Sequence, residues 1–148
     1  MGGGAGYPYS GITEQRKAAL RRREDADVLR SARRWRGAMY LLGYAVECSL
    51  KARLMERFGV STLSGLEREL GRRIGQEVNL RTHSLDLLFE FTKAEHRLDG
   101  DGSQRRAFNR CRTWNVNWRY DPFGGDEVEC LDFFEACNRF LGFVETSV

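Results

Sequence analysis

Proline is almost absent from this chain, which has only Pro8 and Pro122. Between them, no residue carries the rigid ring and missing amide hydrogen that most often break a helix. This interval is rich in Leu, Ala, Arg and Glu, and few of its segments alternate as half-buried strands do. A chain of 148 residues has the size of one domain with one substantial core. The sequence therefore predicts an all-α domain.

Apolar periodicity and helix-end signals divide the chain further. We expect residues 1–12 to form a flexible Gly-rich tail and residues 13–148 to form an antiparallel up-and-down bundle of four long helices plus a short one. Thr13 is the expected N-cap of the first helix, and Gly59 is the expected residue that ends the second. The expected helices are 13–32, 34–58, a short one around 63–70, 82–96, a fourth that Ser103 caps and whose buried face includes Trp114 and Trp118, and a fifth opened by Asp126 and Glu127.

Charge is unevenly distributed although the net charge is only +3. Nine basic residues lie between positions 16 and 36, against Glu24, Asp25 and Asp27, and a second basic cluster covers 105–119. The last helix is instead rich in acids. This asymmetry fits an anion-binding face, complementary surfaces of a dimer, or simply solvated helix faces.

The cysteines and the apolar runs exclude several classes of protein. The four cysteines form no Cys-x-x-Cys pair, and their positions on apolar stripes predict buried thiols rather than metal ligands or disulfides. We expect no metal and no organic cofactor. No run approaches the roughly 20 apolar residues of a membrane span, and the N-terminus lacks the pattern of a signal peptide. We therefore expect a cytoplasmic protein without membrane contact.

The segment from Tyr40 to Ala52 places an acid and a base inside an otherwise apolar helix. Glu47 and Lys51 are one helical turn apart, in the order that favours an intrahelical pair. Charged residues are rarely buried unless they are paired, so the pair lies either on a narrow wet stripe or in a polar site between helices. A structural staple between helices and a direct role in ligand binding both remain open. Gly43, in the same helix, allows a neighbouring helix to approach closely.

Three motifs follow one another in a fixed order: the run 43–52, the run 82–88 with its Thr-His-Ser start, and Trp118-Arg119-Tyr120. Together they resemble the HEPN domain (higher eukaryotes and prokaryotes nucleotide-binding), and the resemblance covers about residues 13–146. It implies a helical bundle that dimerises. It also implies either a metal-independent ribonuclease or a non-catalytic RNA- or nucleotide-binding partner of a nucleotidyltransferase in a toxin–antitoxin or defence pair.

Arg119 matches the arginine of the family's ribonuclease motif, in which a histidine follows after four to six further residues. Here no histidine follows, because the two histidines, His83 and His96, lie upstream. The resemblance therefore supports a non-catalytic or weakly active binding partner, with a metal-independent endoribonuclease that uses Arg119 as the alternative. Arg119 is the catalytic candidate; it binds phosphate or a base, pairs with Glu47, or does both. His83 serves the core, a helix cap or the ligand site. The expected ligand-binding residues are Tyr44, Glu47, Lys51, His83, Arg119 and Tyr120.

Overall fold

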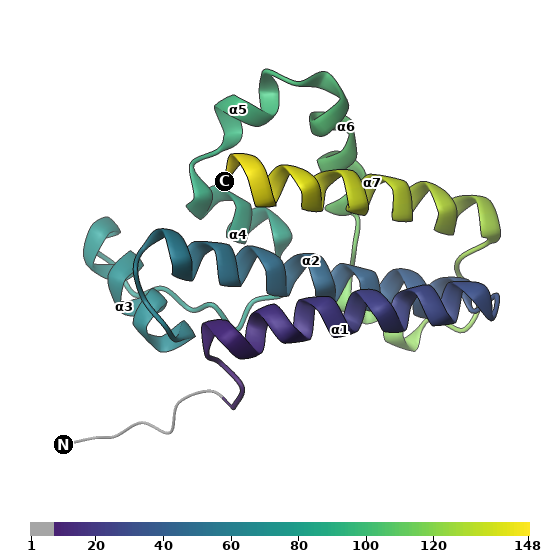
Figure 1. Cartoon of the computed structure of the whole chain (residues 1–148), viewed down its shortest axis with the longest axis horizontal. Helices are drawn as coiled ribbons and strands as arrows, with labels where there is room; N and C mark the ends of the chain where they lie inside the picture. Colours follow the sequence, from purple (N-terminus) through teal and green to yellow (C-terminus); the bar gives the residue numbers. More distant parts are fainter. Residues whose placement is uncertain (1–7) are drawn as a thin grey trace.

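Over the residues that the structure describes, the chain consists of helices and connecting loops (Figure 1). The structure is a computed structural model that describes residues 8–148. No strand occurs in this range, so the all-α prediction is confirmed. The elements are α1 (Ile12–Ser31), α2 (Trp35–Arg57), α3 (Leu63–Ile74), α4 (Leu85–Thr92), α5 (Glu95–Asp99), α6 (Gly102–Cys111), the 3-10 helix η1 (Val116–Tyr120) and α7 (Glu127–Ser147).

Helix α2 is the centre of the fold. It packs against α1, α3, α4, η1 and α7, and α1 runs beside it in the opposite direction (Figure 1). Apolar residues occupy several sides of α2, as expected of a helix surrounded by partners. The buried apolar side chains of α2 include Leu42, Ala45, Val46, Cys48, Leu50, Ala52 and Leu54.

Helix α7 and the α4–α6 segment complete the core around α2. The ring centroid of Phe108 in α6 lies 4.6 Å from that of Phe89 in α4 and 4.8 Å from that of Phe140 in α7. This aromatic cluster joins three helices that are distant in sequence. The apolar face of α7 is buried and includes Cys130, Phe133, Phe134, Cys137, Leu141 and Val144. None of the helices within residues 8–148 combines the length and the apolar content that a bilayer crossing requires.

Two of the expected helix boundaries agree with the structure. The Asp126 carboxylate accepts a hydrogen bond from the Glu129 amide at 2.8 Å and caps α7. Gly59 follows α2 with a φ of 67°, in the left-handed region that favours glycine. The expectation for Thr13 was wrong, because α1 already begins at Ile12 and no side chain caps it.

The expected tail of residues 1–12 has only its last part in the described range, since residues 1–7 lie outside it. The Ile12 amide donates to the Ser61 carbonyl at 2.9 Å, and the Leu63 amide donates to the Ser10 carbonyl at 3.1 Å. Residues 10–12 are therefore attached to the loop that leads into α3.

Two helices, the one expected over residues 82–96 and the one expected from Ser103 to Trp118, are shorter than the apolar periodicity predicted. The segment 82–96 contains α4 and the start of α5, separated where Lys93 adopts a φ of 57°. Helix α6 ends at Cys111 and does not reach Trp118. There the Thr113 hydroxyl donates to the Arg110 carbonyl at 2.7 Å, satisfying a carbonyl of the last turn. The N-cap of α6 is Asp101, where Ser103 was expected.

Candidate functional site

The acid and the base of α2 form a buried ion pair. Glu47 is 4% exposed and Lys51 is 6% exposed. The Lys51 ammonium lies 3.2 Å from Oε2 of Glu47. Because an unpaired buried charge is strongly unfavourable, this contact is what allows both residues inside an apolar helix. Of the two arrangements left open by the sequence, the pair is in the polar site between elements and not on a wet stripe.

His83 completes this network from a distant part of the chain. Its Nδ1 lies 2.7 Å from Oε1 of Glu47, so the two oxygens of one carboxylate bind two different side chains. His83 does not cap α4; Ser84 does, by accepting a hydrogen bond from the Leu87 amide at 3.2 Å. The Glu47–His83 contact therefore ties α2 to the loop before α4, which is the staple considered for this pair.

Tyr44 and Trp114 lie beside the imidazole, and Tyr40 packs against both of them. The Tyr44 ring meets His83 and Trp114 edge-on, with centroid distances of 5.6 Å and 4.9 Å. The Tyr40 hydroxyl donates to the Tyr44 hydroxyl at 3.1 Å, and the Trp114 indole donates to the Tyr40 carbonyl at 3.0 Å. Burial and then the Tyr40 hydrogen bond raise the pKa of Tyr44, so this phenol stays neutral at ordinary pH.

Gly43 explains how Trp114 comes so close to α2. A Cβ atom at this position would collide with the indole ring of Trp114. The sequence predicted that a neighbouring helix approaches closely at Gly43; the close neighbour is instead Trp114, in the loop between α6 and η1.

Arg119 lies at the outer edge of this group, in η1. Its guanidinium carbon lies 4.7 Å from the ring centroid of Tyr120, which is 71% exposed. The phenols of Tyr120 and then Tyr40 raise the pKa of Arg119, and the charge of Arg119 in turn acts to lower the pKa of Tyr44. His83 contacts the ring of Tyr44, and the charge of Arg119 acts on the same phenol.

The structure therefore brings the predicted site residues into one neighbourhood. Lys51 and His83 each bind Glu47, Tyr44 packs against His83, and Arg119 lies over the ring of Tyr120. The alternative pairing of Arg119 with Glu47 does not occur in the described residues, because Lys51 and His83 occupy both carboxylate oxygens.

One arginine of this region was not singled out from the sequence. Arg36 places its guanidinium carbon 4.4 Å from the ring centroid of Trp118. It also lies 3.3 Å from Asp121 and 3.7 Å from Glu129. Its partners are far away in sequence, so no local pattern marks it. Tyr40 was also missed as a site residue, although its spacing of four from Tyr44 indicates a shared helix face.

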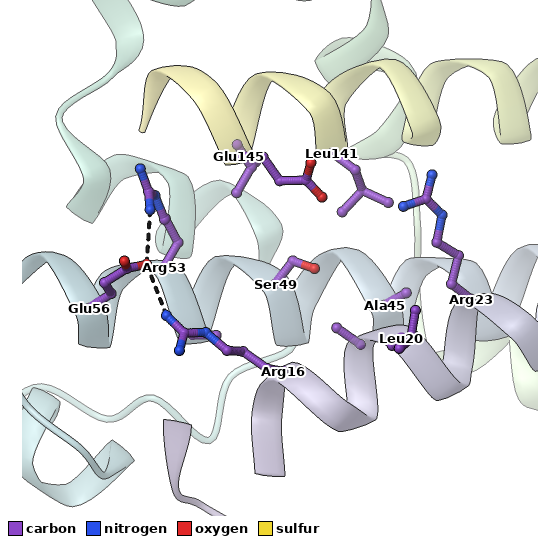
Figure 2. A pocket seen from close by; sticks show the side chains of 12 residues that line it. Arg16, Leu20, Arg23, Ala45, Ser49, Arg53, Glu56, Leu141 and Glu145 are labelled. Carbon is purple, nitrogen blue, oxygen red and sulfur yellow. Dashed lines mark hydrogen bonds and ion pairs between the residues drawn. The ribbon is translucent and has the colours of Figure 1, made fainter. Parts of the chain in front are cut away.

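A groove lies on the opposite side of α2 from Glu47. Successive helical residues are rotated by about 100°, so Ala45 and Ser49 face away from Glu47. The groove they line is bounded by α1, α2 and α7 and encloses about 300 Å³. Figure 2 shows that Arg16 and Arg53, on its rim, both reach Glu56, at 3.0 Å and 2.9 Å. Two of the arginines that line this groove are therefore already paired with a carboxylate.

Within residues 8–148, no group of three or more His, Cys, Asp or Glu side chains is placed to hold a metal ion. All four cysteines are free and buried, as predicted: Cys48, Cys111, Cys130 and Cys137. Comparison of the chain with known protein families, with curated proteins and with solved structures found no match.

Proposed function

We propose that this chain is a HEPN-like domain that binds RNA or a nucleotide at the site formed by Tyr44, Glu47, His83, Arg119 and Tyr120. Arg119 binds a phosphate group, and Tyr120 stacks on a base. Lys51 keeps the buried carboxylate of this site neutralised. The domain is non-catalytic or weakly active as a partner of another enzyme.

The observation that carries this proposal is that Arg119 has no carboxylate partner among the described residues. Several arginines of the chain are held by carboxylates, for example Arg105 by Glu95 and Arg112 by Asp86. Among residues 8–148, no carboxylate lies within ion-pair distance of Arg119, which is exposed and stands beside an exposed tyrosine. A guanidinium without a carboxylate partner keeps its bidentate donors for a phosphate, and an adjacent aromatic ring offers a surface for an unpaired base.

A binding measurement tests the role of Arg119. Fluorescence anisotropy with a labelled random-sequence single-stranded RNA gives the affinity of the wild type and of Arg119→Ala. A charge-assisted hydrogen bond contributes about 1.5–3 kcal/mol, so the variant should bind about 10- to 100-fold more weakly.

The matched control is Arg23→Ala, which removes an arginine from the groove on the opposite side of α2 (Figure 2). It should bind RNA as the wild type does. Unchanged binding by Arg119→Ala would refute the site. Equal losses in both variants would show that RNA follows the general positive charge and not this site.

The assembly is proposed from the resemblance. The domain is expected to pack as an up-and-down bundle of four main helices, to dimerise and to act in the cytoplasm beside a nucleotidyltransferase in a toxin–antitoxin or defence pair. Co-expression with the product of an adjoining nucleotidyltransferase reading frame, followed by size-exclusion chromatography with light scattering, tests this. A monomer that elutes apart from that product would contradict it.

The second candidate function is a metal-independent endoribonuclease. The contact between His83 and Glu47 favours it, since an imidazole fixed by a carboxylate is suited to proton transfer near neutral pH.

A further inference from the structure

We infer that the groove between α1, α2 and α7 binds a small amphiphile, a carboxylate on an apolar body of about eight carbon atoms. Arg23 binds the carboxylate, and Leu20, Leu141 and Val144 receive the apolar body. The groove lies on the other side of α2 from Glu47, so the inference does not depend on the proposed RNA binding.

The groove exists because α2 presents small side chains where two helices separate. Helices α1 and α7 each pack against α2 but make little contact with each other. Between them lie Ala45, Ser49 and Ala52, whose spacing of four and then three residues places them on one face of α2. These side chains are too short to fill the space between α1 and α7. A cavity of about 300 Å³ therefore remains.

The walls of the groove determine the apolar part of the ligand. Figure 2 shows Leu20 on the α1 side and Leu141 on the α7 side, and Val144 lines the same wall as Leu141. Leu20 is 61% exposed, so a ligand that covers it removes apolar surface from water. A water-sized group occupies about 30 Å³ of liquid volume, so this cavity accommodates about ten non-hydrogen atoms. An eight-carbon carboxylate has about this size.

Arg23 is the arginine of the groove that is free to bind an anion. The guanidinium groups of Arg16 and Arg53 are paired with Glu56, whereas no carboxylate within residues 8–148 lies at ion-pair distance from Arg23. Its guanidinium can therefore form two parallel hydrogen bonds with a ligand carboxylate. In Figure 2, Arg23 lies at the opposite end of the groove from Glu56. The head group of the ligand thus lies at the Arg23 end, and the apolar body extends along α2.

Glu145 limits the charge that the ligand can carry. Its carboxylate also extends into the groove, from α7, and no cationic side chain of the described part of the chain lies at ion-pair distance from it (Figure 2). Three arginines and two glutamates line the groove, so its net charge is one positive. This charge is complementary to a monoanion, and Glu145 repels a second negative charge.

Binding to the full chain is measured by proton–nitrogen correlation NMR with three probes of equal chain length. Octanoate is the anion, octanol is the neutral probe and octylamine is the cation. Octanoate should shift the amide signals of the groove and should bind about tenfold more tightly than octanol, because it alone forms charge-assisted hydrogen bonds with Arg23. Octylamine should bind more weakly than octanoate.

Three variants separate recognition of charge from apolar contact. Arg23→Met keeps an apolar chain and should weaken octanoate binding about tenfold while octanol binding stays unchanged. Glu145→Gln removes a repulsion near the surface and should strengthen octanoate binding about two- to fivefold. The matched control Arg110→Met removes the same charge from α6, outside the groove, and should bind octanoate as the wild type does.

Ser49→Leu tests the cavity itself. The added side chain occupies the groove, so this variant should lose octanoate binding. Because the space it fills is empty, its melting temperature in circular dichroism should be at least that of the wild type. A folded variant without binding separates occupation of the groove from general loss of structure.

Three results would overturn the inference. Absence of amide shifts in the groove at millimolar octanoate would show that it is no binding site. Equal affinity of the wild type for the three probes, or unchanged octanoate binding by Arg23→Met, would remove the recognition of a carboxylate. A wild-type dimer that Ser49→Leu converts to a monomer in size-exclusion chromatography would assign the groove to a second copy of the chain.

Discussion

Replacing Glu47 with glutamine measures what the buried network contributes to stability. The amide keeps the size of the side chain but leaves the Lys51 ammonium, which is 6% exposed, without its counter-charge at 3.2 Å. Removing one partner of a buried ion pair costs about 3–5 kcal/mol. This is a large part of the roughly 5–15 kcal/mol that stabilises a typical protein. For a domain of this size, Glu47→Gln should melt about 6–20 °C below the wild type.

Thermal unfolding followed by far-UV circular dichroism checks the shift, and urea titration checks that the m-value is unchanged. Lys51→Met should lose less stability, because Glu47 keeps its contact with His83 at 2.7 Å. The double variant Glu47→Leu with Lys51→Met buries no charge and should be more stable than Glu47→Gln alone. A loss below about 0.5 kcal/mol in Glu47→Gln, the value of an exposed helical pair, would refute the reasoning.

Two further predictions concern close packing and thiols. Gly43→Ala should destabilise by about 1–3 kcal/mol, because the added methyl group meets the ring of Trp114. The control Gly142→Ala has open space around the added methyl group in α7 and should raise the free energy of unfolding by about 0.5–1 kcal/mol. If urea unfolding showed that Gly43→Ala is more stable than the wild type, the close contact between Gly43 and Trp114 would be contradicted. Burial raises the pKa of Cys48 and of Cys130 to about 11. At pH 8 these thiols should react with iodoacetamide at least about tenfold more slowly than free cysteine, and mass spectrometry that finds them alkylated at the free rate would disprove this.

Much of the fold could be predicted because helices depend on near neighbours in sequence. The lack of proline, the apolar stripes of α2 and α7, the cap at Asp126 and the left-handed Gly59 all act within one or two turns. Burial of the cysteines follows from the same stripes. The ends of α4 and α6 could not be predicted in this way. A reversal at Lys93 and a side chain–backbone bond at Thr113 end helices whose apolar periodicity continues.

The sequence by itself also determined that Glu47 and Lys51 must be neighbours, because four residues make one helical turn. Tertiary structure alone decided that this pair is buried, that His83 takes the second carboxylate oxygen from 36 residues away, and that Trp114 lies on Gly43. Tertiary structure also decided that Arg36 stacks on Trp118. It further decided that no carboxylate of the described residues pairs with Arg119. These contacts join residues that are far apart along the chain. They depend on which helices pack together, and a local pattern contains no information about that.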